Sequence, residues 1–368
     1  MSEKRKMIPI MEPDLSGNEK TYLIDAIDSG WISSKGKYVD QFEKEFAAFH
    51  EVDYALAVSN GTVALHLGLV SLGIGKGDEV IVPNLTFASS VNAIIHAGAT
   101  PVLAEVDAET YNIDCNKLDQ YISSKTKAIM PVHLYGNPCD MDEICTIANK
   151  HGLLIIEDNA EGLGSTYKKK IAGSFGDVST FSFYGNKTIT TGEGGAILFK
   201  NQKTFEYAKV LRDHGMSPDR RYWHEHIGFN YRLTNMQAAI GCAQLEHIQD
   251  ILQKKSSIVK RYVDGLAPIG SIKFQKTEAG SLSSNWLFTP LFKNVSTNDL
   301  SQYLHKHGVE TRPAFYPIST MPVYSDFKKG GYDVSESVSK SGLSLPSFPT
   351  LKNSEVDLII AAIKKFYD

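Results

Sequence analysis

Cysteines and long apolar runs are both scarce in this chain of 368 residues. Its four cysteines are far apart and form no CxxC pair, which argues against a zinc site and a disulfide framework and suits a reducing compartment. No apolar run approaches the ~18 residues that a membrane span needs. The basic N-terminus lacks the long apolar core of a signal peptide. We therefore expect a cytoplasmic protein that has no membrane contact and no metal centre.

Excess positive charge and the common phosphate-binding motifs are absent as well. The formal net charge is -4, so no global basic field is available to hold nucleic acid. Neither GxxxxGK[ST] nor GxGxxG occurs, which excludes the usual nucleoside-triphosphate loop and the dinucleotide fingerprint. A hydrophobic content of 42% and a charged content of 22% describe an ordinary globular protein. We expect its partner to be a small molecule or a second copy of the chain.

The apolar pattern predicts an α/β fold with a largely parallel sheet. Between residues 19 and 75 the spacing is mostly helical, and Phe42, Phe46 and Phe49 fall on one face. Further on, short apolar runs recur about every 25 residues, each followed by a helix-like stretch. Two later runs are joined by a glycine-rich turn, as expected for adjacent strands. The predicted strands lie at 78–83, 101–106, 127–132, 153–158, 178–183 and 196–199.

The composition changes in the last third of the chain. From about Leu245 a long helix with charged faces leads to a strand-like segment at 286–291 and to a final amphipathic helix at 354–367. A chain of this length is too long for one simple core and too short for three domains. We predict a large domain over residues 1–250 and a smaller C-terminal α+β domain over residues 251–368.

Two polar residues that follow predicted strands are candidates for chemistry, because parallel α/β sheets bind ligands at the carboxyl ends of their strands. Asp158 ends one run, where a carboxylate can bind a metal, orient a histidine, pair with a protonated pyridine nitrogen or simply cap a helix. Lys187 follows the next run and precedes a double-glycine turn that lets the backbone approach a ligand. Most lysines are surface charges, but a desolvated lysine of lowered pKa is what Schiff-base chemistry requires.

The third candidate is the segment SNGTVALHL at 59–67, where a polar turn containing glycine opens an apolar helix. Free amides and the positive end of the helix dipole make an anion seat there, although the same pattern describes an ordinary capped helix. An anion seat, an acid that pairs with a ring nitrogen and a Schiff-base lysine together are the parts that bind pyridoxal 5'-phosphate (PLP). The combination predicts a PLP enzyme.

With these motifs in place, the sequence resembles the DegT/DnrJ/StrS family of PLP-dependent sugar aminotransferases, of the aspartate-aminotransferase fold type. The resemblance runs from about Ile8 to the C-terminus. It implies PLP-dependent transferase fold type I, in which a large domain with a mostly parallel central sheet flanked by helices carries a smaller C-terminal domain. The matching segments are SNGTVALH at 59–66, GDEVIVP at 77–83, IEDNAE at 156–161, FSFYGNK at 181–187, GEGG at 192–195 and GFNYRLTNMQAAI at 228–240.

The resemblance also implies roles for single residues. Lys187 is implied to form the Schiff base with the cofactor, and Asp158 to pair with its pyridine nitrogen. The other implied cofactor residues are Gly61, Thr62 and Ser182 at the phosphate, Phe87 stacked on the ring, Glu161 near the cofactor, and Asn230 at the phosphate of the neighbouring subunit's cofactor. The last of these implies a homodimer with shared active sites.

Within the family, several segments look most like the group of GDP-perosamine synthases, which aminate C4 of GDP-4-keto-6-deoxy-D-mannose with L-glutamate as donor. They are WISSKG at 31–36, the stretch 184–195, RYWH at 221–224 and ETRPAFYP at 310–317. Ser319 departs from the group, which often has histidine at this position. The departure concerns the preference for sugar or base and leaves the PLP chemistry untouched.

A nucleotide-linked keto sugar and the glutamate/2-oxoglutarate pair are all anionic, so cations must lie near the pocket. Arg232 and Arg312 are the candidates, and surface or interface salt bridges are their alternative role. Trp31 is a candidate for packing against substrate at the mouth of the pocket, or else a buried anchor for the N-terminal segment.

Three other functions stay open at this point. An aminotransferase acting on a UDP- or dTDP-linked keto sugar would differ only in substrate. Related sugar dehydratases of this fold carry histidine where this chain has Lys187, which favours transamination. A non-catalytic PLP-binding regulator is the third, but no helix-turn-helix segment or basic arm supports it.

Overall fold

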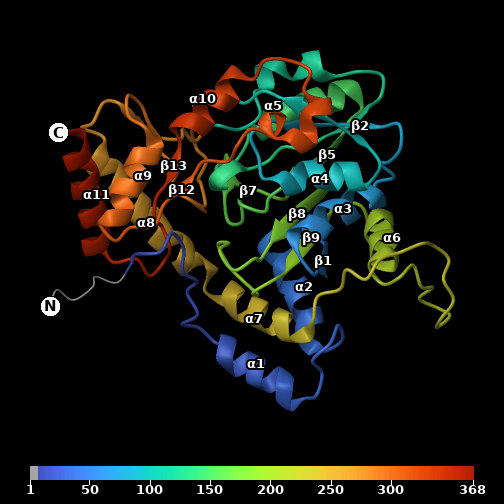
Figure 1. Cartoon of the computed structure of the whole chain (residues 1–368). Helices are drawn as coiled ribbons and strands as arrows, with labels where there is room; N and C mark the ends of the chain where they lie inside the picture. Colours follow the sequence, from blue (N-terminus) through green and yellow to red (C-terminus); the bar gives the residue numbers. More distant parts are fainter. Residues whose placement is uncertain (1–6) are drawn as a thin grey trace.

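The chain, described over residues 7–368 by a computed structural model, is built around a seven-stranded sheet (Figure 1). The strands of this sheet are β1 (Tyr54–Val58), β2 (Glu79–Pro83), β3 (Thr100–Ala104), β4 (Thr126–Ile129), β5 (Leu154–Asp158), β8 (Val178–Ser182) and β9 (Gly195–Phe199). They lie in the order β1-β9-β8-β5-β4-β2-β3. β9 is antiparallel to β1 and β8, and all the other pairs are parallel. The predicted α/β fold with a largely parallel sheet is confirmed.

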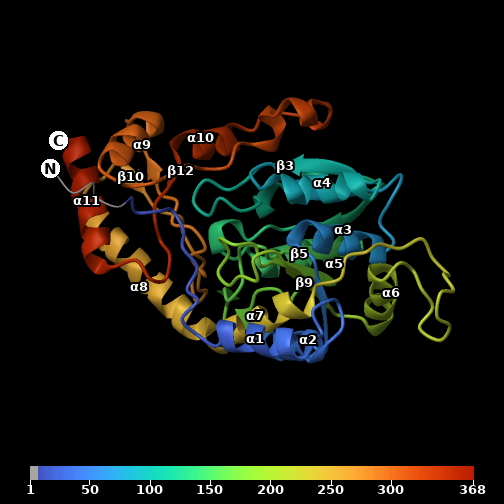
Figure 2. The same cartoon turned by 60° about the horizontal axis from the view of Figure 1, so that its bottom comes forward.

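Helices cover both faces of the sheet, as Figures 1 and 2 show. The reason is that successive side chains of a strand point to opposite faces of the sheet, and both faces of this sheet are apolar and must be covered. In β1, Ala55 and Ala57 pack in a core with the helices α2 and α7, while Leu56 and Val58 point to the other face and pack with α3 and α6. The helices of this large unit are α1 (Glu19–Asp28), α2 (Lys37–Phe49), α3 (Gly61–Ser71), α4 (Ala88–His96), α5 (Met141–His151), α6 (Gln202–Arg212) and α7 (Asn235–Glu246).

The predicted strands are all present within a few residues of their expected positions. The predicted apolar face of α2 is also confirmed, because Phe42 and Phe46 are fully buried and Phe49 packs against the same core. The helical interpretation of residues 19–75 was wrong at β1, which lies inside that range. Four of its five residues are buried, so no alternation of polar and apolar residues separated it from the helices around it.

The C-terminal part of the chain has a core of its own, seen at the left in Figure 1. Its elements are α8 (Ile248–Leu266), β10 (Ile272–Lys273), β11 (Leu291–Phe292), α9 (Thr297–Lys306), β12 (Arg312–Pro313), α10 (Asp333–Ser341), β13 (Leu343–Ser344) and α11 (Asn353–Tyr367). The helix expected from Leu245 onward is divided at His247, where α7 ends and α8 begins. In the strand-like segment 286–291 only the last residue belongs to a strand, although Phe288 forms an isolated bridge with Leu345.

Each of the two units also includes, in its core, residues from the sequence range of the other unit. Ile8 lies in the core of the C-terminal unit and exchanges backbone hydrogen bonds with Gly308 and Glu310. In the opposite direction, Ile318 and Tyr324 join the core of the large unit. A domain boundary near residue 250 therefore stays a proposal, which the separate C-terminal core supports.

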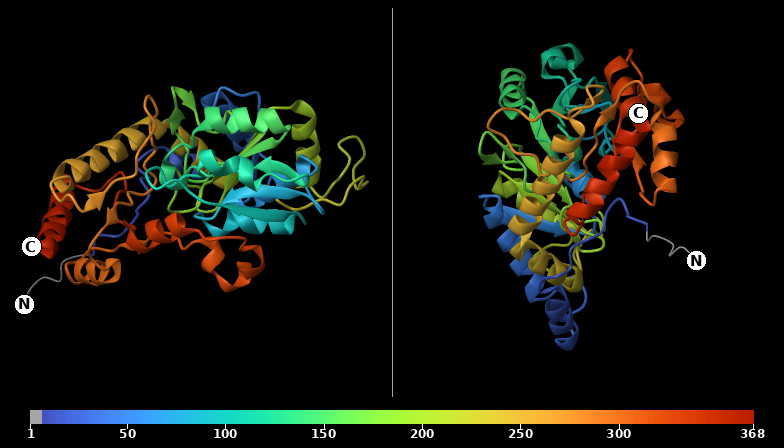
Figure 3. Two further views of the ribbon diagram at one scale, coloured as in Figure 1. Left: turned by 90° about the horizontal axis from the view of Figure 1, so that it is seen from above. Right: turned by 90° about the vertical axis from the view of Figure 1, so that its left-hand side faces the viewer.

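Seen from above, the C-terminal unit lies at one end of the molecule, and the loop between α6 and α7 projects at the other end (Figure 3). The remaining elements are the hairpin β6 (Thr166–Tyr167) and β7 (Lys170–Ile171) and the 3-10 helices η1 (Cys115–Tyr121), η2 (Leu134–Gly136), η3 (Ile318–Thr320) and η4 (Pro322–Phe327). Within residues 7–368, no helix combines the length and apolar character needed to cross a bilayer.

Candidate active site

A cavity of about 710 Å³ lies at the carboxyl ends of the parallel strands, where the C-terminal unit meets the large unit. This edge is the usual ligand-binding side of a parallel sheet. The fold brings most of the predicted site residues together here. Those that line the cavity are Gly61, Thr62, Phe87, Asp158, Glu161, Ser182, Lys187 and Arg312.

Lys187 projects into this cavity from the segment that follows β8. Its side chain is only 13% exposed, and its Nζ lies 4.0 Å from Oε1 of Glu161. The indole ring of Trp286 covers the same nitrogen, with 3.9 Å between Nζ and the ring centroid. Burial lowers the pKa of Lys187, against the opposing effect of Glu161 and Asp158. A lysine of lowered pKa has more of the neutral amine that attacks a carbonyl.

Asp158 is the last residue of β5 and is buried at the floor of the cavity. Ser90 donates a hydrogen bond from Oγ to its Oδ2 at 2.7 Å, and the backbone N–H of Ala160 donates to Oδ1 at 3.2 Å. Burial raises the pKa of Asp158 despite these two donors. A cationic N–H of a ligand at this floor would stabilise the carboxylate, as a protonated ring nitrogen does.

Glu161 is a second buried acid, three residues beyond Asp158 in the turn that follows β5. The backbone N–H of Tyr135 donates to its Oε2 at 2.7 Å, and Lys187 faces its other oxygen. Burial raises the pKa of Glu161 to about 7, although Lys187 opposes the shift. Glu161 can therefore hold or release a proton near neutral pH.

The anion seat predicted at 59–67 is the N-terminus of α3. Asn60 caps this helix: its Oδ1 accepts from the N–H of Val63 at 3.0 Å. Within the described part of the chain, the N–H groups of Gly61 and Thr62 have no hydrogen-bond acceptor. A Cβ on Gly61 would lie 2.8 Å from Cβ of Ser182, so glycine is needed for the close approach that brings this hydroxyl to the helix end. Free amides with a hydroxyl beside them suit a phosphate group.

Aromatic rings form one wall of the cavity. Phe87 is 57% exposed, and its ring centroid lies 5.8 Å from that of Phe315. Phe315 in turn contacts Tyr135 at 5.4 Å between centroids, and its N–H donates to the hydroxyl of Tyr135 at 2.9 Å. An accessible ring on a rigid wall can stack on a planar heterocycle.

The residues of the cavity therefore fit PLP in all three of its parts. A buried carboxylate suits a protonated ring nitrogen, free amides with a hydroxyl suit the phosphate, and a desolvated amine can bind the aldehyde carbon.

Several residues of this site were not predicted from the sequence. Ser90 gave no signal, because a serine in the first turn of a helix is common. Trp286 lies in the segment interpreted as a strand, and nothing in that pattern placed its ring over Lys187. Tyr135 contributes a backbone N–H, which no residue pattern marks.

Three predicted residues do not line the cavity of their own chain. Asn230 and Arg232 lie between α6 and α7, where Arg232 forms an ion pair with Asp213 at 2.8 Å and donates to Asn230 at 3.0 Å. Trp31 is 57% exposed, so it is not the buried anchor that the sequence left open. The roles of these three residues stay predictions.

Arg312 and Ser319 differ in their relation to the cavity. Arg312 lines it, is half exposed and lies 3.8 Å from Glu310. Ser319, the residue at which the sequence departs from the GDP-perosamine synthase pattern, is buried and donates its N–H to Oδ1 of Asn84 at 2.9 Å. Over residues 7–368, no cluster of three or more His, Cys, Asp or Glu side chains is arranged to hold a metal ion.

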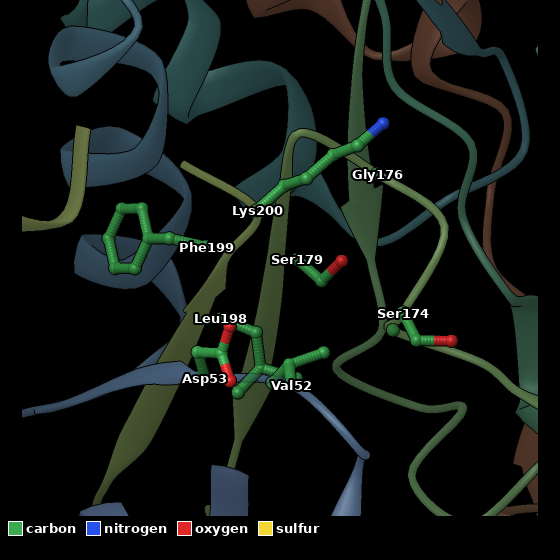
Figure 4. Close-up of a pocket in the computed structure, with 9 residues that line it drawn as sticks. Val52, Asp53, Ser174, Gly176, Ser179, Leu198, Phe199 and Lys200 are labelled. Atoms are coloured by element: carbon green, nitrogen blue, oxygen red, sulfur yellow. The ribbon is translucent and has the colours of Figure 1, made fainter. Parts of the chain in front are cut away.

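A second hollow, of about 190 Å³, lies at the other end of the sheet strands (Figure 4). In the view of Figure 4, Lys200 lies above Ser179, and Leu198, Asp53 and Val52 lie together below them. None of the predicted site residues lines it. We therefore assign the chemistry to the larger cavity.

Fold and site together define an α/β protein with a lysine, two acids and an anion seat at the carboxyl edge of its sheet. The model of the DegT/DnrJ/EryC1/StrS aminotransferase family matches residues 13–364, and the chain belongs to this family. The predicted resemblance is confirmed.

Curated relatives and solved structures agree with this assignment. The GDP-perosamine synthase of Escherichia coli O157:H7 is 46% identical over 363 residues, which cover 98% of this chain and 99% of that one. The GDP-perosamine synthase of Vibrio cholerae is 44% identical over 366 residues, covering 98% and 100%. The PLP form of the putative sugar aminotransferase Spr1654 from Streptococcus pneumoniae superposes with a TM-score of 0.93 at 30% identity, covering 98% of both chains. The predicted fold type is thereby confirmed.

Proposed function

We propose that the protein is a PLP-dependent aminotransferase of a nucleotide-linked 4-keto-6-deoxy sugar, which converts GDP-4-keto-6-deoxy-D-mannose to GDP-perosamine with L-glutamate as donor. The observation that carries the proposal is the meeting of Lys187, Asp158 and the free amides of α3 in one cavity. The identity of 44% to 46% with two GDP-perosamine synthases over nearly the whole chain supports the sugar and the nucleotide.

The residues of the cavity divide the work of holding the cofactor. Gly61, Thr62 and Ser182 would bind the phosphate, and Phe87 would stack on the ring. Asp158 would keep the ring nitrogen protonated, because a buried carboxylate with a raised pKa gains most from a cationic partner. When bound, PLP supplies the electron sink that accepts the electron pair of the donor's Cα–H bond.

Lys187 and Glu161 are placed to move protons. Lys187 would take the proton from the α-carbon of glutamate and return it to the cofactor, with its lowered pKa making the neutral base available. Glu161, whose pKa is about 7, lies 4.0 Å from that amine and can share its proton. The second half of the reaction uses the same groups in reverse order.

Substrate binding needs cations, and Arg312 at the cavity is our candidate for the donor carboxylate. Asn230, Arg232 and Trp31 lie outside the cavity of their own chain, which supports a role at the site of a second subunit in a homodimer. We also propose a cytoplasmic location, which the free state of all four cysteines supports.

An absorbance experiment tests the function in one cuvette. Purified wild type with PLP should show a visible band that glutamate abolishes and that GDP-4-keto-6-deoxymannose restores. Lys187→Ala should fail to complete this cycle. If glutamate changes the band and only a UDP- or dTDP-linked keto sugar restores it, the proposed substrate is wrong and the enzyme class stands. If wild type binds no PLP, the function itself is wrong.

A further inference from the structure

Lys255 is a buried lysine outside the cavity. It lies on α8, its residue exposure is 0%, and no carboxylate of the described residues lies within 4.0 Å of its Nζ. Its Nζ donates instead to two backbone carbonyls, those of Trp286 at 3.3 Å and Ser347 at 2.8 Å. Burial lowers the pKa of Lys255 to about 7. Both the charged and the neutral amine can donate to these two oxygens.

The carbonyls of Trp286 and Ser347 belong to two neighbouring segments, and residues of both segments line the cavity. Leu345 donates its N–H to the carbonyl of Phe288 at 2.9 Å, and Phe288 donates its N–H to Oγ of Ser347 at 3.3 Å. Lys255 therefore joins α8 to both segments, because it binds the backbone of Trp286 in one and the backbone of Ser347 in the other. A buried amine without an acid partner is unfavourable for stability, and an apolar residue of similar volume often packs better.

Trp286 connects this anchor to the candidate active site. Its indole Nε1 donates to the carbonyl of Asn186 at 2.7 Å, next to Lys187 in the sequence. Its ring covers Nζ of Lys187 at 3.9 Å and packs near Tyr135 and Phe315, which line the same cavity. The backbone of Trp286 is thus held by Lys255, while its side chain touches the lysine that carries the chemistry.

We propose that Lys255 is a positioning residue for the Schiff-base lysine: by binding the carbonyl of Trp286, it holds the indole ring over Nζ of Lys187. The inference rests on the proposed role of Lys187. The indole face stabilises positive charge on the nitrogen that it covers and shields it from water. Loss of the anchor should loosen the ring, lower the affinity of that nitrogen for a proton and weaken its alignment.

The test compares Lys255→Met with Lys254→Met in the full chain saturated with PLP. Methionine keeps an unbranched apolar stem and removes the donors, while Lys254 is a neighbour on α8 that pairs with Asp14 and is half exposed. The readouts are the pH midpoint of the Lys187-dependent absorbance band, the circular dichroism of that band, kcat and the melting temperature. We expect Lys255→Met to lower the midpoint, change the dichroism and reduce kcat on the order of tenfold, because misalignment slows chemistry. Lys254→Met should match wild type in the midpoint, the dichroism and kcat, while its melting temperature falls because the buried carboxylate of Asp14 loses its partner.

Trp286→Phe keeps the proposal testable even if Lys255→Met does not fold. This variant should lower the midpoint as well, and in its background Lys255→Met should add little, since both changes act through one ring. The proposal is overturned if Trp286→Phe leaves the midpoint unchanged, or if Lys255→Met lowers the melting temperature and leaves the band as in wild type. If wild type and Lys187→Ala show the same spectrum, the proposed function has failed, which is a different result.

Discussion

At the scale of single residues, the site is a set of buried titratable groups whose charges shift one another's pKa. Lys187 has a lowered pKa and Glu161 a raised one, and both shifts are caused mainly by burial. Asp158 is raised for the same reason. Such a group of opposed shifts in one cavity is typical of catalytic sites.

Replacement of Asp158 by asparagine should reduce turnover strongly and preserve the shape of the site. Asparagine can still accept from Ser90, but it cannot hold a proton on the ring nitrogen. We expect kcat to fall on the order of 100-fold or more, as for the loss of a central electrostatic group. Steady-state kinetics checks this, with Ser90→Ala as a milder control. A kcat within a factor of about two of wild type would rule out the assigned role.

Glu161 makes the stability of the cofactor-free protein depend on pH. Its pKa is raised from 4.5 to about 7, so the folded protein binds a proton that the unfolded chain releases in this range. The resulting stability is present below pH 4.5 and is lost as the pH rises through 7. Glu161→Gln removes this dependence. The free energy of unfolding of the variant relative to wild type should rise between pH 5 and pH 8, by on the order of 3 kcal/mol at most. Denaturant titrations at both pH values measure it, and a flat difference would contradict the shift.

At the scale of elements, the site forms because two strands end and one helix begins at the same edge of the sheet. β5 ends at Asp158, β8 ends at Ser182 and α3 begins at Gly61, so the same edge of the sheet collects an acid, a hydroxyl and free amides. The two strand ends were predictable because each closes a short apolar run, and the start of α3 because a polar turn containing glycine opens an apolar helix. β1 was not, because its apolar residues resemble part of the helices on either side.

The helix end at Gly61 offers a prediction about cofactor affinity. Gly61→Ala places a Cβ 2.8 Å from Cβ of Ser182, which pushes this hydroxyl away from the amides. We expect the Kd for PLP to rise about tenfold, the loss of roughly one hydrogen bond to an anion. Fluorescence titration with PLP measures it. Gly270→Ala is the matched control, because nothing lies within 4 Å of a Cβ there. Equal affinities in the two variants would count against the phosphate seat.

At the scale of the whole molecule, the site is closed by parts that are distant in sequence. The C-terminal unit contributes Trp286, Arg312 and Phe315 to the cavity of the large unit. The loop between α6 and α7 projects from the opposite end of the molecule (Figure 3), and Asn230 and Arg232 lie at its base, where Asn230 bridges Asp213 and Arg232 bridges Val58 of β1. Neither residue lines the cavity of its own chain, and their role at the site of a second subunit stays a proposal.

Subunit mixing tests the shared site directly. Lys187→Ala inactivates its own site, and Asn230→Asp should repel the cofactor phosphate in the partner's site. After exchange, each mixed dimer would hold one doubly altered site and one intact site, so activity should return to about a quarter of wild type. The mixture is compared with each variant alone. If both residues serve the same subunit, the mixture stays inactive.

Local patterns in the sequence determined the fold class, the family and the residues at strand ends, because these depend on neighbours within one element. Lys187 and Asp158 were found in this way. Only the tertiary structure decided which groups surround them. Ser90 donates a hydrogen bond to Asp158, the ring of Trp286 covers Lys187, and Lys255 binds the backbone of Trp286. Each of these pairs joins segments that are distant in the sequence and meet only through packing. Packing depends on the volumes and directions of many side chains at once, and no short stretch of sequence records it.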